Sequence, residues 1–131
     1  MEAVIPILPT LKARSEFLAV RGGRRSSTPA FLIEMRERPG VTTRAGEGPR
    51  FGFTITKKIG NAVTRNRIRR RLKAAFAADL KQRHLGACDY VVVARHAALD
   101  RPFALLLGDV THAMSALHRS RPARADKKGS A

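Results

Sequence analysis

The chain has 131 residues, with 26 Lys or Arg against 10 Asp or Glu, so its formal net charge is +16. This length suits a single domain, and a hydrophobic fraction of 44% is enough to build a core, which excludes wholesale disorder. The lone cysteine, Cys88, cannot form an internal disulfide, which excludes a disulfide-stapled secreted scaffold and favours a reducing, cytoplasmic location.

The charge predicts a polyanionic partner, either nucleic acid or an anionic membrane surface. No apolar run approaches the ~18–20 residues of a membrane span. The N-terminal segment also lacks the basic region of a signal peptide, so we expect neither a membrane helix nor a cleaved leader.

The N-terminal part of the chain predicts one helix followed by a strand. Residues 1–9 are expected to be a flexible N-terminus, and Thr10 is expected to cap a helix that ends near Val20. Residues 21–29 predict a basic loop, with an extra short strand before Phe31 as the alternative. Phe31 to Met35 predicts a strand, and the Gly- and Pro-rich residues 39–49 predict a mobile connection.

The middle and end of the chain predict two further strands and two helices. Residues 51–56 alternate large and small side chains, which is typical of a strand with one buried and one free face. Asn61 or Thr64 is expected to start a long helix to about His84, and residues 90–94 predict a central strand. Asp100 is expected to cap a last helix with Pro102 in its first turn.

Together these elements predict one small α+β domain at residues 10–118, with helices covering one sheet face and the other face partly open. Residues 119–131 are rich in Arg, Lys, Pro, Ala, Gly and Ser and predict a disordered basic tail.

Half of the net charge lies in residues 57–73, which hold eight Lys or Arg and no acid, whereas residues 74–118 are neutral overall. This concentration favours a nucleic acid over a membrane surface. Ile68, Leu72 and Phe76 share one helical face that docks on the protein, so the basic side chains spread around the rest. Composition alone leaves a merely solvated helix face as the alternative. The predicted RNA-binding residues are Lys57, Lys58, Asn61, Arg65, Asn66, Arg67, Arg69, Arg70, Arg71 and Lys73.

The run from Phe51 to Phe76 resembles the signature of the bacterial ribonuclease P protein component, through the segments KKIGNAV (57–63) and RNRIRR (65–70). Glu16-Phe17 and residues 91–95 extend the resemblance, which covers about residues 10–118. It implies a small α/β sandwich with a left-handed β-α-β crossover around the Arg-Asn-Arg helix.

The resemblance also implies a function. Members of this family bind the catalytic RNA of ribonuclease P, and the holoenzyme removes the 5′ leader of precursor tRNA by Mg²⁺-dependent hydrolysis at the RNA's active site. The chain is therefore expected to be an accessory subunit, bound 1:1, with no catalytic or metal-binding residue of its own. A cleft between the first helix and the open sheet face is expected to receive the leader. The residues implied to line or border it are Phe17, Arg21, Phe31, Lys58 and Arg95.

Phe17 is equally well explained as a core residue that seals the first helix. Several relatives have aromatic residues at the positions of Arg21 and Glu34, so charge rather than stacking is expected to act there.

The histidines and the cysteine do not form a pattern typical of a metal site or a catalytic site. His84, His96, His112 and His118 lack metal-ligand spacing, and His112 and His118 are expected at the surface. Cys88 is expected to be a small buried residue. The alternatives to a ribozyme subunit are an independent RNA- or DNA-binding module, which would not need this motif, and an autonomous nuclease, which would need paired carboxylates.

Overall fold

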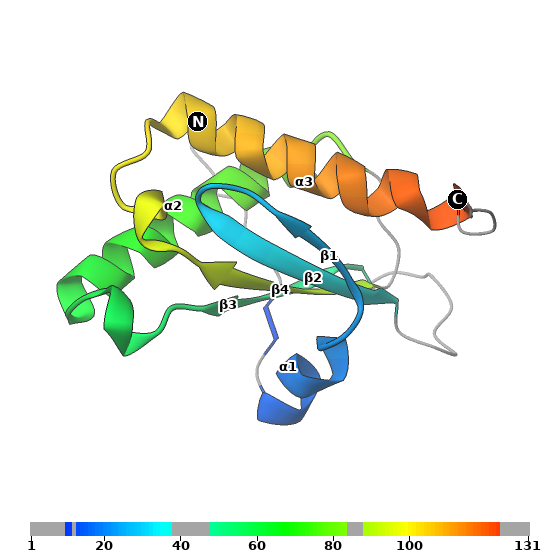
Figure 1. Ribbon diagram of the computed structural model, residues 1–131, viewed down its shortest axis with the longest axis horizontal. Helices are drawn as coiled ribbons and strands as arrows, with labels where there is room; N and C mark the ends of the chain where they lie inside the picture. The colour runs from blue at the N-terminus through cyan, green and yellow to red at the C-terminus, as the bar shows by residue number, and fades with distance from the viewer. Residues whose placement is uncertain (1–9, 12, 38–47, 84–87, 124–131) are drawn as a thin grey trace, which may run out of the picture.

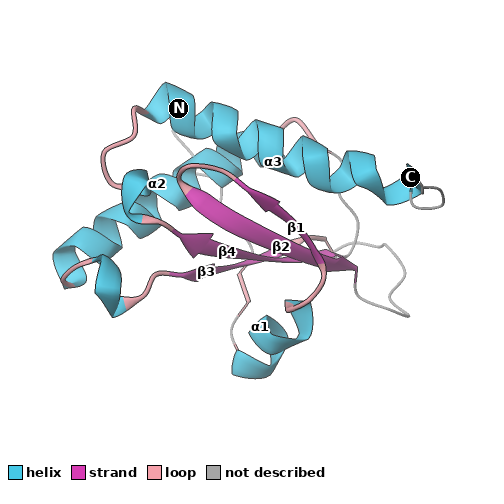
Figure 2. Cartoon of the chain, viewed as in Figure 1, coloured by secondary structure: helices cyan, strands magenta, loops and turns pink. Residues whose placement is uncertain are grey.

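The computed structural model describes residues 10–11, 13–37, 48–83 and 88–123, with burial described as far as residue 118. The chain forms α1 (Arg14–Val20), β1 (Arg24–Ser27), β2 (Phe31–Glu37), β3 (Arg50–Thr54), α2 (Ala62–Leu80), β4 (Cys88–Ala94) and α3 (Phe103–Ala123) (Figure 2). Two short 3-10 helices, η1 (Lys57–Ile59) and η2 (His96–Ala98), precede α2 and α3. None of the helices in the described part of the chain combines the length and apolar character needed to cross a bilayer.

The four strands form one mixed sheet in the order β1-β2-β4-β3. β1 pairs with β2 and β2 with β4 in antiparallel fashion, whereas β3 and β4 are parallel. A parallel pair needs a crossover connection, and α2 supplies it, so the expected β-α-β unit contains the Arg-Asn-Arg helix. The sheet places the predicted central strand, β4, inside and leaves β3 at an edge.

Helices α2 and α3 lie against one face of the sheet, and the short α1 lies on the opposite face (Figure 1). The main core fills the space under α2 and α3. Within it the ring of Phe51 stacks on that of Tyr90 with centroids 4.8 Å apart, and Phe76 of α2 lies 5.4 Å from Phe31 and from Phe51. A smaller buried cluster of Leu11, Val20 and Val91 attaches α1 to the other face. The α+β fold is thus confirmed, with the second face only partly covered.

The long basic helix begins where the sequence predicted. Asn61 is its N-cap, because its Oδ1 accepts a hydrogen bond from the Thr64 backbone N–H at 2.9 Å. The predicted docking face is also confirmed, since Ile68, Leu72 and Phe76 are buried. The helix ends at Leu80, earlier than expected, and His84 lies outside the described residues.

The start of α1 differs from expectation. The predicted cap at Thr10 is wrong, because Thr10 forms a bridge to Phe51 at the edge of β3 and α1 begins after Ala13. The helix is capped from inside instead, where Glu16 Oε1 accepts from the Ala13 backbone N–H at 3.0 Å. In the basic segment after α1, the alternative of an extra short strand before Phe31 is confirmed, since the segment contains β1.

Helix α3 also departs from expectation at both ends. The predicted cap at Asp100 is wrong, because the helix begins at Phe103 and the Pro102 carbonyl accepts from the Leu106 N–H at 3.0 Å. The predicted tail boundary is wrong as well, since residues 119–123 continue the helix to Ala123. The segments 1–9, 39–47 and 124–131, expected to be flexible, lie outside the described residues.

Candidate RNA-binding surface

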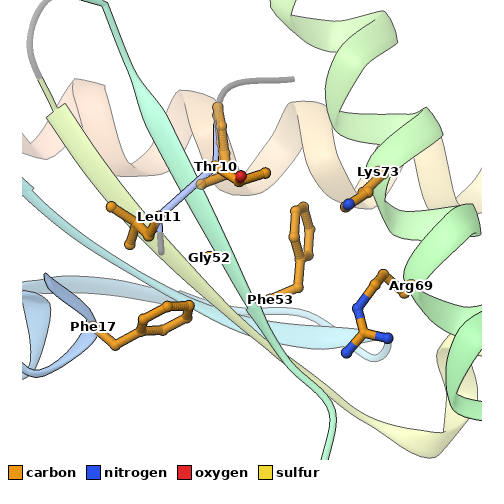
Figure 3. Close-up of a pocket in the computed structure, with 8 residues that line it drawn as sticks. Thr10, Leu11, Phe17, Gly52, Phe53, Arg69 and Lys73 are labelled. Atoms are coloured by element: carbon orange, nitrogen blue, oxygen red, sulfur yellow. The ribbon is translucent and has the colours of Figure 1, made fainter. Parts of the chain in front are cut away.

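A pocket of about 180 Å³ opens at the edge of the sheet where β3 passes between α1 and α2 (Figure 3). Phe17 enters it from α1, Gly52 and Phe53 lie in the strand, and Arg69 and Lys73 reach it from α2 (Figure 3). The remaining lining residues are Thr10, Leu11 and Phe51. The volume is below the ~300–1,000 Å³ of a typical drug-sized ligand site. It therefore suits part of an extended polymer rather than a whole cofactor.

Phe17 lies directly on the backbone of β3. A Cβ atom at residue 52 would come within 2.3 Å of Phe17 Cε2, so the ring occupies the space that any side chain at Gly52 would need. The ring is half-buried and packs beside Leu11, Val20 and Val91. Phe17 thus combines the two roles that the sequence left open, since it helps to seal α1 onto the sheet and also lines the pocket.

One flank of α2 is basic and faces this pocket. Arg69 and Lys73 are one helical turn apart and both line it. Arg65, a further turn towards the N-terminus, donates from Nε to the Gly60 carbonyl oxygen at 3.1 Å. An aromatic ring on one side and two cations on the other are what a single-stranded nucleic acid requires, because bases stack on rings and phosphates attract cations.

The outward side of the same region is also basic. Lys57 and Lys58 of η1 are exposed, whereas Ile59 packs against the core. The exposed face of α2 is basic, and the N-terminus of the helix adds its own partial positive charge. Asn61 is exposed too, but its Oδ1 is already engaged in the cap. The predicted RNA-binding residues exposed on this outward side are Lys57, Lys58, Asn66, Arg67 and Arg70.

The relatives of this chain agree with one another. A family model described as Ribonuclease P matches residues 8–118. The ribonuclease P protein component of Brucella suis is 47% identical over 109 residues, covering 81% of this chain and 77% of the relative. The component from Paramagnetospirillum magneticum is 38% identical over 122 residues, covering 90% of this chain and 91% of the relative. The chain belongs to the ribonuclease P protein family.

Solved structures of ribonuclease P proteins share its fold. The Staphylococcus aureus protein aligns with a TM-score of 0.66 at 24% identity, covering 82% of this chain and 93% of that one. The Thermotoga maritima protein aligns with a TM-score of 0.63 at 21% identity, covering 84% and 96%. Membership of the ribonuclease P protein family implies a role in tRNA processing.

Two residues predicted for the RNA-facing surface are structural in this ribonuclease P protein. Phe31 was assigned to the leader cleft, but it is fully buried on the opposite sheet face against Phe76, so that prediction is wrong. Arg71 donates from Nε to the Ala98 carbonyl oxygen at 2.9 Å and from Nη2 to the Arg101 carbonyl oxygen. Its guanidinium therefore joins α2 to the segment before α3. Arg71 is not part of the proposed RNA-binding surface.

The remaining predicted cleft residues lie apart from the pocket. Arg21 is exposed just beyond α1, and Arg95 donates from Nη1 to the Thr28 carbonyl oxygen at 2.7 Å, at the far end of β4. Lys58 is exposed on η1. None of these three residues lines the pocket, and their contact with RNA stays a prediction. Glu34, on the α1 side of the sheet, is buried and ion-paired with Arg25 at 3.1 Å.

An ion-pair network near the pocket went undetected in the sequence. Arg50 of β3 binds Asp89 of β4 through two hydrogen bonds of 2.9 Å and Glu16 of α1 through one of 3.0 Å. The pKa of the Arg50 guanidinium is raised above its ordinary value, chiefly by the hydrogen bond to Asp89. The one signal in the sequence is Asp89 itself, an acid placed directly before the buried β-branched run.

Five of the acids in the described residues pair with arginines. Asp79 pairs with Arg83, and Asp109 pairs with Arg101. Within the described ranges, no three His, Cys, Asp or Glu side chains gather closely enough to hold a metal ion. His118, predicted at the surface, is half-buried with Nε2 2.7 Å from the Tyr90 hydroxyl, so that prediction is wrong. Cys88 is buried, as expected.

Proposed function

We propose that this chain is the protein subunit of the ribonuclease P ribonucleoprotein, bound 1:1 to its catalytic RNA. The exposed cations of η1 and α2 bind that RNA, and the pocket at β3 binds the single-stranded 5′ leader of precursor tRNA. The complex removes the leader to give the mature 5′ end, with the catalytic groups residing in the RNA.

The observation that carries this proposal is the position of Phe17 across from Arg69 and Lys73 on one edge of the sheet. Stacking on an aromatic ring is tolerant of sequence, because every base has a π face, and cations hold phosphates irrespective of the base attached. A leader whose sequence differs between tRNAs needs a site of this kind. A base-reading site would instead need directed hydrogen-bond donors and acceptors.

The second support is the uneven distribution of charge. Residues 57–73 contribute half of the net charge and are consecutive along η1 and the first part of α2, where Arg69 and Lys73 line the pocket. Two RNA segments brought together in one complex repel each other through their phosphates. Cations placed beside both segments reduce that repulsion, so we expect the protein to lower the Mg²⁺ concentration that the RNA requires.

Mg²⁺ itself is assigned to the RNA. Within the described part of the chain, the carboxylates of Glu16, Glu34, Asp79, Asp89 and Asp109 are poorly suited to a magnesium site, because each is paired with arginine. Magnesium prefers several oxygen ligands arranged as an octahedron, and these carboxylates are spread over different elements. The contribution of the protein is binding, orientation and electrostatic screening.

Cleavage assays with the protein alone, the catalytic RNA alone and both together test the proposal, each over a range of Mg²⁺ concentrations. The protein alone should leave precursor tRNA intact, and its addition to the RNA should move cleavage to lower Mg²⁺. Cleavage by the protein alone would contradict the assignment. Equally tight binding to an unrelated structured RNA of the same length would favour an independent RNA-binding module instead.

A further inference from the structure

We propose that Arg50 and Gly52 of β3 are positioning residues, which fix where the Phe17 ring stands at the edge of the sheet and so set the affinity for the leader. This inference rests on the proposed function, because it assigns residues that act on the leader through Phe17. Neither residue would be recognised from the basic motif, since Arg50 lies outside it and Gly52 has no side chain.

Arg50 is fully engaged within the protein. Its Nε and Nη2 donate to the two oxygens of Asp89 at 2.9 Å each, and its Nη1 donates to Glu16 Oε2 at 3.0 Å. The Asp89 side chain is 3% exposed, so the forked pair with Arg50 is held firmly in the sheet. The third bond leaves the sheet and reaches α1. Arg50 is therefore a brace between the strand and the helix.

The hydrogen bond from Arg50 to α1 is made to Glu16, the residue next to Phe17 in the chain. Glu16 precedes Phe17, and while its Oε2 receives Arg50, its Oε1 accepts from the Ala13 N–H at 3.0 Å. One carboxylate thus caps α1 and also ties it to β3. A helix of seven residues is too short to be stable alone, so its location depends on such contacts.

Gly52 fixes the height of the ring above the strand. A glycine inside a strand is mildly unfavourable. Gly52 does not have a positive φ, so its backbone conformation does not require glycine. The reason for a glycine here is the lack of room for a side chain. A Cβ here would lie 2.3 Å from Phe17 Cε2 and 2.6 Å from Cζ, which is closer than atoms approach. The ring would have to move away from β3. Gly52 lets Phe17 rest on the backbone and face the pocket from a fixed position.

The test uses the reconstituted holoenzyme and precursor tRNA made non-cleavable at the scissile bond, with either a long leader or a one-nucleotide leader. Gly52→Ala moves the ring without altering charge, and Glu16→Gln weakens the brace while keeping an oxygen for the cap. We expect each to weaken binding of the long-leader substrate by about 5-fold or more, given the usual value of one stacked base. Binding of the short-leader substrate and of the catalytic RNA should be unchanged.

Gly108→Ala is the matched control, because a Cβ at this exposed glycine of α3 meets no atom within 4 Å. It should bind both substrates as the parent protein does. Thermal unfolding of each variant reports whether the fold is retained. A loss of long-leader affinity in Gly108→Ala equal to that in Gly52→Ala would overturn the proposal.

A double-mutant cycle separates this inference from the function on which it rests. If Phe17→Ala leaves long-leader affinity unchanged, the proposed leader site is wrong. If Phe17→Ala weakens binding but Gly52→Ala and Glu16→Gln do not, the positioning role is overturned while the leader site stands. In Phe17→Ala combined with Gly52→Ala, we expect no loss beyond that of Phe17→Ala alone. Additive losses would show that Gly52 acts independently of Phe17 and would also overturn the proposal.

Discussion

Arg71 of α2 and Ala98 of η2 are joined by a hydrogen bond, with the arginine Nε 2.9 Å from the alanine carbonyl oxygen. The same guanidinium also donates to the Arg101 carbonyl oxygen. An arginine in the most basic stretch of the chain therefore fastens the connection between β4 and α3. Its neighbour Arg70 is exposed, so two adjacent arginines serve different purposes.

Replacement of Arg71 by Ala should mainly destabilise the fold. Two backbone carbonyls lose a charged donor, for which we expect a loss of about 1.5–3 kcal/mol in the free energy of unfolding. Arg70→Ala is the matched control and should leave that free energy within about 0.5 kcal/mol, because the side chain is exposed. Urea unfolding measures both. Equal destabilisation by the two variants would contradict the structural role of Arg71.

Replacements on the two flanks of α2 should affect RNA binding in different ways. Arg67 is exposed away from the pocket and Arg69 lines it, so both replacements by Ala should reduce the salt dependence of binding by about 0.7–0.9 for each phosphate that is no longer neutralised. Only Arg69→Ala should lose affinity that depends on leader length. Titrations at several salt concentrations, with long- and short-leader substrates, measure this. An unchanged salt slope in both variants would mean that α2 does not contact phosphates.

Phe31 should behave as a core residue. Its replacement by Ala should lower the free energy of unfolding by about 3–5 kcal/mol, because a fully buried ring leaves a cavity against Phe76. Phe31→Leu, which keeps most of the volume, should fold and bind long- and short-leader substrates as the parent protein does. If Phe31→Leu weakened binding of the long-leader substrate alone, the prediction that Phe31 lines the leader cleft would be correct after all.

Stability should fall at alkaline pH because of Tyr90. Burial raises the pKa of the Tyr90 hydroxyl well above its usual 10, so the folded protein keeps the phenol neutral. A raised pKa contributes stability that is complete below the unfolded value near 10 and is lost as the pH rises above it. In Tyr90→Phe this part of the decline should be absent. Thermal unfolding of both proteins from pH 8 to 11 measures the difference, and parallel declines would refute the prediction.

The spacing of apolar residues in the sequence predicts most helices and strands and the faces that they bury. Ile68, Leu72 and Phe76 recur at helical spacing and are buried, and Phe51 of β3 and Ile55 just after its end are buried as the predicted alternation requires. Such patterns depend on local geometry alone. The motif residues likewise lead to the correct family and to the pocket-lining flank of α2.

The role of a side chain could not be predicted from the sequence where it depends on a tertiary contact. Arg69 and Arg71 lie on opposite flanks of the same helix, and only the packing of η2 against one flank makes Arg71 structural. Phe31 stands in an apolar run, where periodicity does not tell which of two covered faces a ring joins. Thr10 has the chemistry of a cap, but Glu16 caps α1 from within and Thr10 pairs with the strand.

β3 connects the two parts of the molecule that are proposed to contact RNA. At one end Arg50 holds α1, and past the other end Thr54 leads into η1 and α2. An extended strand of five residues spans about 13–17 Å and, paired to β4 along its length, neither stretches nor bends readily. The strand therefore acts as a rigid spacer that keeps the ring proposed to bind the leader at a constant distance from the helix proposed to face the catalytic RNA.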